Sequence, residues 1–425
     1  MRPINRPAYL KTLRSWRDKD VIKVITGVRR CGKSTLLSLF QNELLADGVP
    51  ESRIIDINLE LIENERLLDY RALHNEILSR CDSRARNYVF IDEVQNVPDF
   101  QRAVDSLYAR DNIDLYITGS NALLLRGTLA TLLSGRYVEI QATPFSFAEF
   151  CSCHADGNTS PRRLWSEYLH TGGFPAMRSI DDERARHDYL TGILDTVLLK
   201  DVAQRLNIAN TNLLGALSAY LFDNVGNLTN PKRISDALTS NGMKTSPATI
   251  SEYLSGLCNS YIFYPVQRYD LKGRRLLELQ RKYYAVDPGM RRAALSGADR
   301  DTGRLLEGTV YFELLRREGP VYVGRGPAGE VDFITHGSEG VKYYQVCESV
   351  VDPGTREREL SSLRAIPDNH PKYLLTLDDE RPTSHDGIQQ LYVLDWLLEE
   401  SQREGRSNTT QDAEAFDMPG ESTQR

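Results

Sequence analysis

The chain has 425 residues, of which 40% are hydrophobic and 26% charged, so it is long enough to form about three domains. Its formal net charge of −7 excludes a chain that is basic overall, so a surface that binds nucleic acid would have to be local. Six cysteines are too few for a disulfide framework at this length, and no apolar run reaches the length of about 18 residues that spans a bilayer. Because the first residues also lack the apolar core of a signal peptide, we expect a cytoplasmic protein without membrane contact.

After a short amphipathic helix predicted at residues 7–18, the chain presents a strand, a glycine-rich loop and a helix. Residues 21–26 are a β-branched run, and residues 27–35 read Gly-Val-Arg-Arg-Cys-Gly-Lys-Ser-Thr, before a helical pattern that starts at Leu36. The loop fits Gly-x-x-x-x-Gly-Lys-Ser/Thr at every position, and this order of elements is typical of a phosphate-binding loop. The alternative is a glycine turn that happens to precede Lys-Ser.

The residue types of this loop suit a nucleoside triphosphate. Glycine allows positive φ and close approach to phosphate, and the backbone N–H groups at a helix N-terminus attract anions. The Lys33 ammonium can reach the β- and γ-phosphates, and the Ser34 hydroxyl can ligate Mg²⁺. Cys31 is either an oxidation-sensitive thiol or a neutral position. The predicted nucleotide-binding residues here are Gly27, Val28, Arg29, Arg30, Cys31, Gly32, Lys33, Ser34 and Thr35.

Strand and helix patterns continue to alternate up to residue 140. We predict strands at 53–59, 87–91, 113–118 and 136–140, with helices at 69–81 and 99–110. Strands that are apolar on both faces and separated by helices indicate an α/β fold with a parallel sheet covered on both sides. Ligands of such sheets bind beyond the carboxyl ends of the strands.

Polar residues follow two of these strands. Asp92 can hold Mg²⁺, and Glu93 can orient and deprotonate the attacking water; an exposed acidic turn is the alternative. After the next strand, Ser120 and Asn121 can sense the γ-phosphate, or else cap the following helix without touching nucleotide. We therefore predict Asp92 and Ser34 as metal ligands and Glu93 and Lys33 as catalytic residues.

Six motifs together resemble those of prokaryotic AAA+-like P-loop ATPases of the DUF4143 type. They are the phosphate loop, Val-Phe-Ile-Asp-Glu at 89–93, Ile-Thr-Gly-Ser-Asn at 117–121, Leu-Ser-Gly-Arg-Tyr at 133–137, Pro-Phe-Ser-Phe at 144–147 and Gly-Gly-Phe-Pro at 172–175. The resemblance implies an AAA+-type core, ATP as the nucleotide and hydrolysis as the reaction. It also makes Arg136 a candidate arginine finger or sensor, in its own chain or a neighbour's; otherwise Arg136 is a strand-end arginine paired with an acid.

The middle of the chain is predicted to be helical and then to form a winged helix. Residues 161–206 resemble a lid or linker, and helices at 213–224, 230–238 and 248–257 precede strands at 262–269 and 276–279. The candidate DNA contacts in the connecting turn are Lys272, Arg274 and Arg275, but no Lys or Arg lies between Ser246 and Leu257. A role in contacting a protein client therefore stays open beside DNA binding.

The last third resembles the PD-(D/E)xK nuclease fold, with Asp332 and either Glu307 or Glu330 as candidate acids. Gln345 and Cys347 stand where the second acid and the lysine belong, so we expect a domain that does not cut nucleic acid. Residues 401–425 are polar and predicted to be a disordered tail.

These readings divide the chain into an ATPase core (1–160), a lid or linker (161–206), a winged helix (207–300), a nuclease-like domain (301–400) and the tail. The expected function is Mg²⁺-dependent ATP hydrolysis by a monomer or a homo-oligomer. The competing hypotheses are an ATP-dependent switch without hydrolysis, a DNA- or protein-binding module and an active nuclease.

Overall fold

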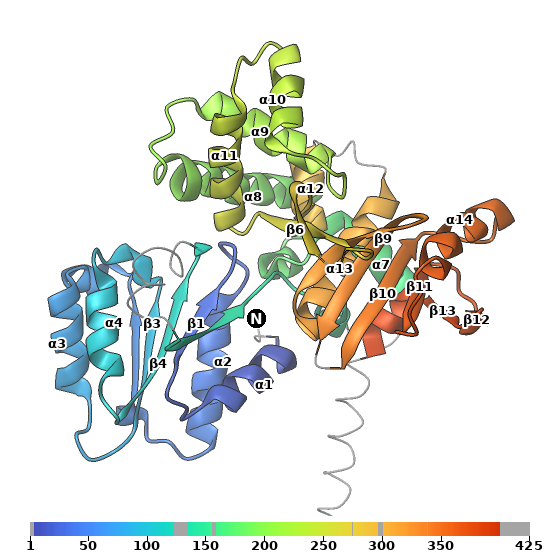
Figure 1. Cartoon of the computed structure of the whole chain (residues 1–425). Helices are drawn as coiled ribbons and strands as arrows, with labels where there is room; N and C mark the ends of the chain where they lie inside the picture. Colours follow the sequence, from blue (N-terminus) through green and yellow to red (C-terminus); the bar gives the residue numbers. More distant parts are fainter. Residues whose placement is uncertain are drawn as a thin grey trace, which may run out of the picture. The chain divides into compact units, whose positions relative to one another are not determined.

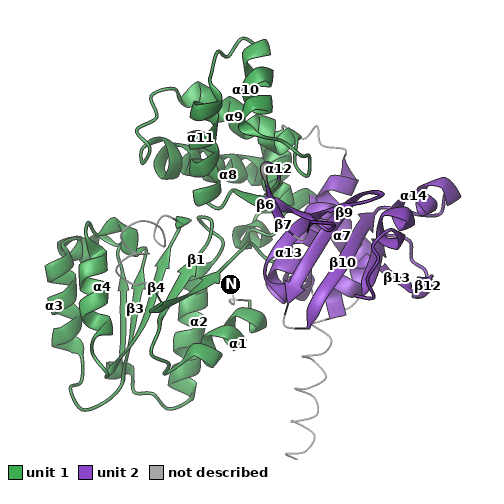
Figure 2. Cartoon of the chain, in the orientation of Figure 1, with its two compact units in different colours: residues 1–145, 170–265, 282–299 green, residues 146–169, 266–281, 300–425 purple. Residues whose placement is uncertain are grey.

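The computed structural model describes residues 4–122, 135–154, 159–273, 275–295, 301–337 and 339–399 (Figure 1). These residues form two compact units (Figure 2), of which unit 1 comprises 1–145, 170–265 and 282–299, and unit 2 comprises 146–169, 266–281 and 300–425. The expected domains were continuous stretches of chain, whereas both units are discontinuous. The expected tail lies outside the described residues.

Unit 1 contains a five-stranded parallel sheet of order β2-β3-β4-β1-β5. Each strand lies within one residue of its predicted position. The bounds are β1 Ile22–Thr26, β2 Ile54–Asn58, β3 Asn87–Asp92, β4 Ile113–Gly119 and β5 Tyr137–Gln141. Strands β1, β3 and β4 are buried along their whole length, as expected for a sheet covered on both faces.

The helices of this part are α1 Pro7–Trp16, α2 Lys33–Ala46, α3 Tyr70–Arg80 and α4 Phe100–Tyr108, with short 3₁₀ turns at Glu51–Arg53, Ile62–Leu67 and Val94–Asn96. On one face of the sheet, Phe40 of α2 packs against Phe90 and Tyr116, with ring centroids 6.4 and 5.4 Å away. On the other face, residues of α3 and α4 such as Leu73 and Val104 join the core of the sheet. Alternate side chains of each strand therefore serve opposite layers.

A charged pair lies inside this core. Lys23 in the middle of β1 is fully buried and is paired with Asp114 of β4, which also accepts a hydrogen bond from the Tyr116 hydroxyl at 2.9 Å. Burial lowers the pKa of Lys23. The pair satisfies a charge that would otherwise be incompatible with a central strand.

The rest of unit 1 is mainly helical. The elements are a 3₁₀ turn η5 Pro175–Ser179, α8 Glu183–Thr196, a π-helical turn η6 Val197–Ala203, α9 Thr211–Asp223, α10 Pro231–Ser240, α11 Pro247–Asn259 and α12 Pro288–Ala294. The Asn230 and Ser246 side chains cap α10 and α11, and each is followed by proline at the first helical position. The helices predicted in the middle of the chain are therefore confirmed.

The two strands after α11 differ from a free wing. They are β6 Phe263–Asp270 and β7 Arg275–Ala285, so β7 is much longer than the predicted 276–279. Residues 268–270 of β6 pair in parallel with β8 Val321–Gly326 and so join the larger sheet. This pairing involves the unit 2 part of β6. In an isolated wing, the outer backbone N–H and C=O groups of β6 would be unpaired. Here the groups at residues 268–270 pair with β8.

Unit 2 is built on an eight-stranded sheet of order β12-β13-β11-β10-β9-β8-β6-β7. Its further strands are β9 Gly329–Gly337, β10 Gly340–Cys347, β11 Lys372–Thr376, β12 Thr383–His385 and β13 Ile388–Tyr392, and its helices are α6 Phe147–Cys153, α7 Pro161–Thr171, α13 Thr302–Glu318 and α14 Pro353–Arg364. Tyr311 of α13 contacts Phe333 on one face, and Leu360 of α14 shares a core with Ile334 on the other. Cys151 and Cys153 lie in the last turn of α6, which begins with a Ser146–Glu149 capping box. None of the described helices combines the length and apolar character needed to cross a membrane.

Candidate nucleotide-binding site

The phosphate loop connects β1 to α2 in a conformation that requires glycine. Gly27 has φ 146°, and a Cβ there would lie 2.0 Å from the carbonyl oxygen of Ala142. Gly32 has φ 100° and is the N-cap of α2. The loop therefore places backbone N–H groups at a helix N-terminus beyond the carboxyl end of β1, where an anion is favoured.

Lys33, the first residue of α2, is buried. Its ammonium donates hydrogen bonds to the carbonyl oxygens of Gly27 and Val28 at 3.1 and 3.2 Å. The same nitrogen lies 3.6 Å from a carboxylate oxygen of Glu93. The loop thus holds a positive charge between its own carbonyls and the end of β3.

The two acids at the end of β3 are tied to the end of β4. The Thr118 hydroxyl donates to Asp92, and the Glu93 backbone N–H donates to that hydroxyl oxygen at 2.9 Å. Asn58 at the end of β2 donates to the other oxygen of Asp92 at 3.1 Å. Both acids are less than a tenth exposed, so the alternative of an exposed acidic turn is wrong.

The carboxylate of Glu93 is held by two neighbours. It accepts a hydrogen bond from the Ser120 hydroxyl at 3.2 Å and another from the Gln95 amide, and its backbone has φ 54°. Ser120 therefore lies in the predicted site. Asn121 is buried next to it, whereas the helix that it could cap lies outside the described residues.

Arg29 extends from the phosphate loop to the π-helical turn. Its Nε and Nη2 donate to the two carboxylate oxygens of Asp201 at 2.6 and 3.1 Å, and Nη1 lies 3.4 Å from Glu60. Asp201 is buried and also lies 3.5 Å from Arg205. Burial would lower the pKa of Arg29, but the hydrogen bonds and charge of Asp201 outweigh burial and raise it.

A cavity of about 730 Å³ lies beside these residues within unit 1. One wall consists of the phosphate loop with Glu60 and Glu93. The other consists of η5, α8 and η6, which contribute Pro175, Ala176, Asp188, Tyr189, Gly192, Ile193, Thr196 and Lys200. This volume lies within the range of about 300–1,000 Å³ that is common for small-molecule sites.

Sequence reasoning missed Asn58, Gln95 and Asp201. The sequence did contain a signal for Asp201, which lies between Val197 and Val202 in an apolar helical run. A buried acid in such a run is expected to have a basic side chain as its ion-pair partner. Asn58 and Gln95 carry no such signal, since they occupy ordinary polar positions next to a strand end and a turn.

Cys31 is fully buried, and its sulfur lies 3.5 Å from the carbonyl oxygen of Ala142. Burial raises the pKa of the Cys31 thiol, so the thiolate needed for oxidation is disfavoured. The loop is also braced by Arg6, which donates to the carbonyl oxygens of Cys31 and Thr143 at 3.3 and 2.9 Å. Burial and the raised pKa favour the alternative of a neutral position for Cys31.

Arg136 does not lie at the nucleotide site of its own chain. It precedes β5, and its carbonyl oxygen bonds the Ile22 N–H at the amino end of β1, whereas the phosphate loop follows the carboxyl end. Its guanidinium pairs with Asp105 at 2.8 Å and is half exposed. A catalytic role of Arg136 within its own chain is therefore wrong, because the parallel sheet separates it from the loop by the length of β1.

The Gly-Gly-Phe-Pro turn is fitted against Asp287, the N-cap of α12. The Gly173 N–H donates to Asp287 at 2.6 Å, and a Cβ on Gly173 would lie 2.3 Å from the carbonyl oxygen of Phe145. Burial raises the pKa of Asp287 to about 6, although backbone N–H groups at Gly173, Met290 and Gly289 oppose this shift. The turn therefore fixes the position of η5, which follows it directly and forms the first part of the second wall of the cavity.

The acids predicted for a nuclease-like site in unit 2 do not form a metal cage. The Gln345 amide donates to Glu359 at 2.8 Å, and its oxygen accepts the Asp332 N–H at 3.3 Å. Asp332 itself accepts the Val346 N–H at 2.9 Å. Across the described part of the chain, no three His, Cys, Asp or Glu side chains are grouped to bind a metal ion.

The nucleotide site needs no such cage for Mg²⁺. This ion takes one or two protein oxygens and fills its octahedron with phosphates and water. The Asp92 carboxylate and Ser34 at the start of α2 are donors of that kind, and Asn58 and Thr118 orient the carboxylate. The residues present fit a magnesium–nucleotide complex.

Comparison with known proteins agrees with this arrangement. Residues 19–151 match the family described as "AAA domain", and residues 162–301 match "Domain of unknown function (DUF8612)", so the expected DUF4143 type is not found. The Walker-type ATPase PABY2304 of Pyrococcus abyssi, at 16% identity and a TM-score of 0.50, covers 69% of this chain and 96% of its own; at this identity the likeness shows the fold alone.

Two relatives extend along most of the chain. An uncharacterized protein of Haemophilus influenzae is 40% identical over 401 residues, which are 93% of this chain and 99% of its own length. The uncharacterized protein MJ1544 of Methanocaldococcus jannaschii is 30% identical over 399 residues, which are 89% of this chain and 86% of its own length. The chain therefore belongs to one family with these two proteins, and within it residues 19–151 match an AAA domain.

Proposed function

We propose that this protein binds ATP with Mg²⁺ and hydrolyses it. The observation that supports this function best is the meeting of Lys33, Asp92 and Glu93 at one edge of one sheet, although they follow two different strands. All three side chains are buried, and Lys33 and Glu93 line a cavity large enough for a nucleotide.

Each residue has a role that its surroundings support. The loop N–H groups and Lys33 bind the phosphates, and Ser34 and Asp92 would hold Mg²⁺, which neutralises phosphate charge when bound. Glu93 orients the attacking water and accepts its proton, since Ser120 and Gln95 hold the carboxylate in place. Ser120 is then a positioning residue that acts through Glu93.

The competing function is an ATP-dependent switch that does not hydrolyse. Glu93→Gln keeps the shape of the side chain but removes the base, so we expect phosphate release to fall by about 10²-fold or more while ATP binding persists. Lys33→Ala should lose binding as well. Glu63→Gln, which changes an exposed acid in the turn Ile62–Leu67, is the matched control. Equal phosphate release by wild type and Glu93→Gln, with tight ATP binding in both, would establish the switch.

The task coupled to ATP is proposed to be a movement of the helical wall. Because α8 and η6 line the cavity and Asp201 holds Arg29, a nucleotide contacts both walls at once. The exposed Arg136 can then serve only the nucleotide of a second copy. Light scattering with and without ATP, on wild type and Arg136→Ala, tests this: an ATP-dependent oligomer whose turnover needs Arg136 supports the role in trans.

DNA binding is a second candidate. It is supported by three helices and a hairpin in winged-helix order, and by exposed Lys272 and Arg275 at the turn; Arg274 lies outside the described residues. Removing phosphate contacts should weaken binding to all sequences and reduce its salt dependence. An affinity for duplex DNA that is unchanged after Lys272, Arg274 and Arg275 are all replaced by alanine would exclude this surface.

A further inference from the structure

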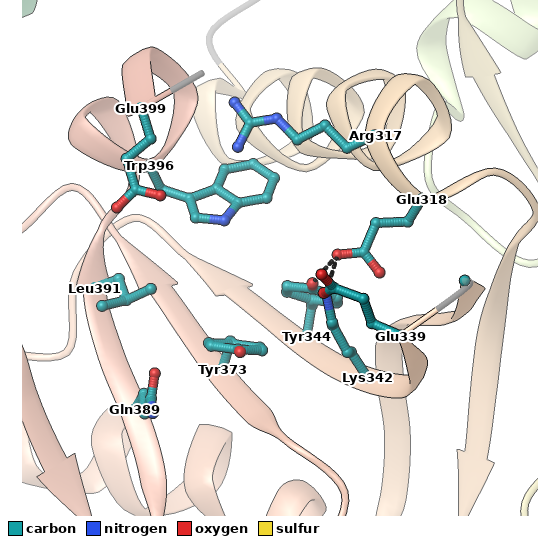
Figure 3. A pocket seen from close by; sticks show the side chains of 11 residues that line it. Arg317, Glu318, Glu339, Lys342, Tyr344, Tyr373, Gln389, Leu391, Trp396 and Glu399 are labelled. Carbon is teal, nitrogen blue, oxygen red and sulfur yellow. Dashed lines mark hydrogen bonds and ion pairs between the residues drawn. The ribbon is translucent and has the colours of Figure 1, made fainter. Parts of the chain in front are cut away.

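Unit 2 has a cavity of about 580 Å³ that none of the roles above uses. Figure 3 shows Tyr344 and Tyr373 between Leu391 and Gln389 on one side and Glu318, Glu339 and Lys342 on the other, with Trp396 and Arg317 above them. The last lining residues are Gly337 and Glu399. The volume is several times that of one side chain, and it lies within the usual range of ligand sites.

The cavity lies on the face of the sheet that carries α13. Lys342 and Tyr344 alternate along β10 with Tyr343 and Gln345, so the two sets point to opposite faces. Tyr344 donates to Glu318 at the end of α13 at 2.8 Å, whereas Gln345 bonds Glu359 of α14. The cavity is therefore separate from the acids predicted for a nuclease.

Its floor and one wall are aromatic. Tyr344 and Tyr373 are paired neighbours on β10 and β11, with ring centroids 5.1 Å apart and planes at 17°. Trp396 lies 6.2 Å from Tyr344, and the Arg317 guanidinium already covers Trp396 at 4.6 Å. Faces of such rings are partially negative and attract cations.

The two cations in the lining are fully engaged. Lys342 is paired with Glu318 and with Glu339, each at 2.9 Å, and Arg317 is paired with Glu313 at 2.7 Å. Burial would raise the pKa of Glu318, but hydrogen bonds from Thr335, Lys342 and Tyr344 outweigh burial and lower it. An anionic ligand would have to displace these carboxylates from the two cations.

The remaining polar groups accept hydrogen bonds or attract positive charge. Within the described residues, the side chains of Tyr373, Gln389 and Glu399 make no hydrogen bond or ion pair, and Gln389 and Glu399 are exposed. Lys342 already pairs with Glu318 and Glu339, so among the described lining residues Glu399 is the carboxylate that has no ion pair. Both the charge balance and the aromatic floor favour a cation.

We propose that this cavity binds a basic side chain, a guanidinium or ammonium, presented by a peptide segment. The alkyl stem would pack on Leu391 and Trp396, and the charge would lie over Tyr373 beside Glu399. We assign this basic group to a partner protein, because the exposed Glu399 and the ring of Tyr373 present a surface complementary to positive charge; residues 401–425 of this chain, which include Arg403, Arg406 and Arg425, are the competing source that the test separates. The proposal does not depend on ATP hydrolysis.

The test is calorimetric titration of the full chain with the capped peptides acetyl-Gly-Arg-Gly-amide and acetyl-Gly-Glu-Gly-amide. We expect saturable, millimolar binding of the arginine peptide, weakened by salt, and no binding of the glutamate peptide. Glu399→Gln and Tyr373→Leu should each weaken binding by about two- to fivefold, the effect of one partly exposed charge or cation–π contact. Glu380→Gln, an exposed acid on the loop after β11, should change nothing.

The outcomes separate the proposal from general charge attraction. Equal binding of both peptides, or equal effects of Glu399→Gln and Glu380→Gln, would overturn it. Deleting residues 401–425 identifies the source of the basic group. Tighter peptide binding after the deletion would mean that the tail occupies the cavity and would overturn the assignment to a partner protein. Unchanged binding supports that assignment, and lost binding places the site in the tail and refutes the proposal.

Discussion

Arg29 of the phosphate loop and Asp201 of the π-helical turn form a two-pronged ion pair, although 172 residues separate them in sequence. The side chain of Asp201 is 1% exposed and that of Arg29 is 20% exposed. Asp201 also lies near Arg205, whose pKa burial lowers. The loop that would bind phosphate is therefore fixed to the helical wall by one buried carboxylate, and π-turns within helices are frequent at functional sites.

We predict that Asp201→Asn weakens both the fold and the response to nucleotide. The change removes the carboxylate that Arg29 and Arg205 share and leaves Arg29 with only its longer contact to the exposed Glu60, so the free energy of unfolding should fall by about 1–3 kcal/mol. Thermal unfolding with and without ATP–Mg²⁺ measures both effects, and the stabilisation by ATP should also become smaller. Asp195→Asn, on the exposed side of α8, should stay within about 0.5 kcal/mol of wild type. If both variants behaved alike, Asp201 would have no special role.

Thr118→Val should impair hydrolysis more than binding. The substitution keeps the volume but removes the hydroxyl that joins Asp92 to the Glu93 N–H, which leaves a buried donor unsatisfied at a cost of about 1–3 kcal/mol. We expect a lower kcat at nearly unchanged ATP affinity, measured by phosphate release and titration. Thr118→Ser restores the hydroxyl and should recover most of the activity. Failure of serine to do so would contradict the hydrogen-bonding role.

Gly173→Ala should destabilise unit 1. The added methyl would approach the Phe145 carbonyl oxygen to 2.3 Å, so the turn must shift, at an expected cost of about 1–3 kcal/mol in urea denaturation. Gly215→Ala is the matched control inside α9, where nothing lies within 4 Å of the new methyl. Its helix propensity should leave the protein as stable as wild type or more stable by up to about 1 kcal/mol. Equal losses for both variants would contradict the close approach at Gly173.

Asp287 should make unit 1 more stable on mild acidification. Burial raises its pKa from the ordinary 3.8 to about 6, so between these values the folded state binds a proton that the unfolded state does not. As pH falls from 7 to 4, wild type should therefore gain stability relative to Asp287→Asn, by up to about 3 kcal/mol.

Urea denaturation across this pH range measures the difference in free energy of unfolding between wild type and Asp287→Asn. The titration of all other groups contributes equally to both proteins and cancels from this difference. Asp352→Asn provides a control that should run nearly parallel to wild type over this range, because the Thr355 N–H lowers the pKa of that exposed N-cap, and its contribution is lost only as pH falls below the ordinary value. Parallel curves of unfolding free energy against pH for wild type and Asp287→Asn would show that burial does not raise the pKa of Asp287.

The phosphate loop, the five parallel strands and the acids at the end of β3 could all be predicted from the sequence. These features are local: alternation of apolar runs with helical patterns defines the layers, and loop chemistry requires glycine, lysine and serine at fixed spacing. The sequence also indicated the middle helices, because Asn230-Pro231 and Ser246-Pro247 are strong start signals.

Contacts between residues that are far apart in sequence could be identified from the folded structure alone. The strand order places Arg136 at the amino end of β1, whereas the phosphate loop follows the carboxyl end. Strand β6 pairs with β8 because the unpaired N–H and C=O groups of a strand edge can bind any suitable neighbouring strand. Lys23 with Asp114, Arg29 with Asp201 and Gly173 with Asp287 are pairs of this kind. The physical reason is that a buried charge or a close backbone contact depends on a partner that lies far along the chain, and no local pattern identifies that partner.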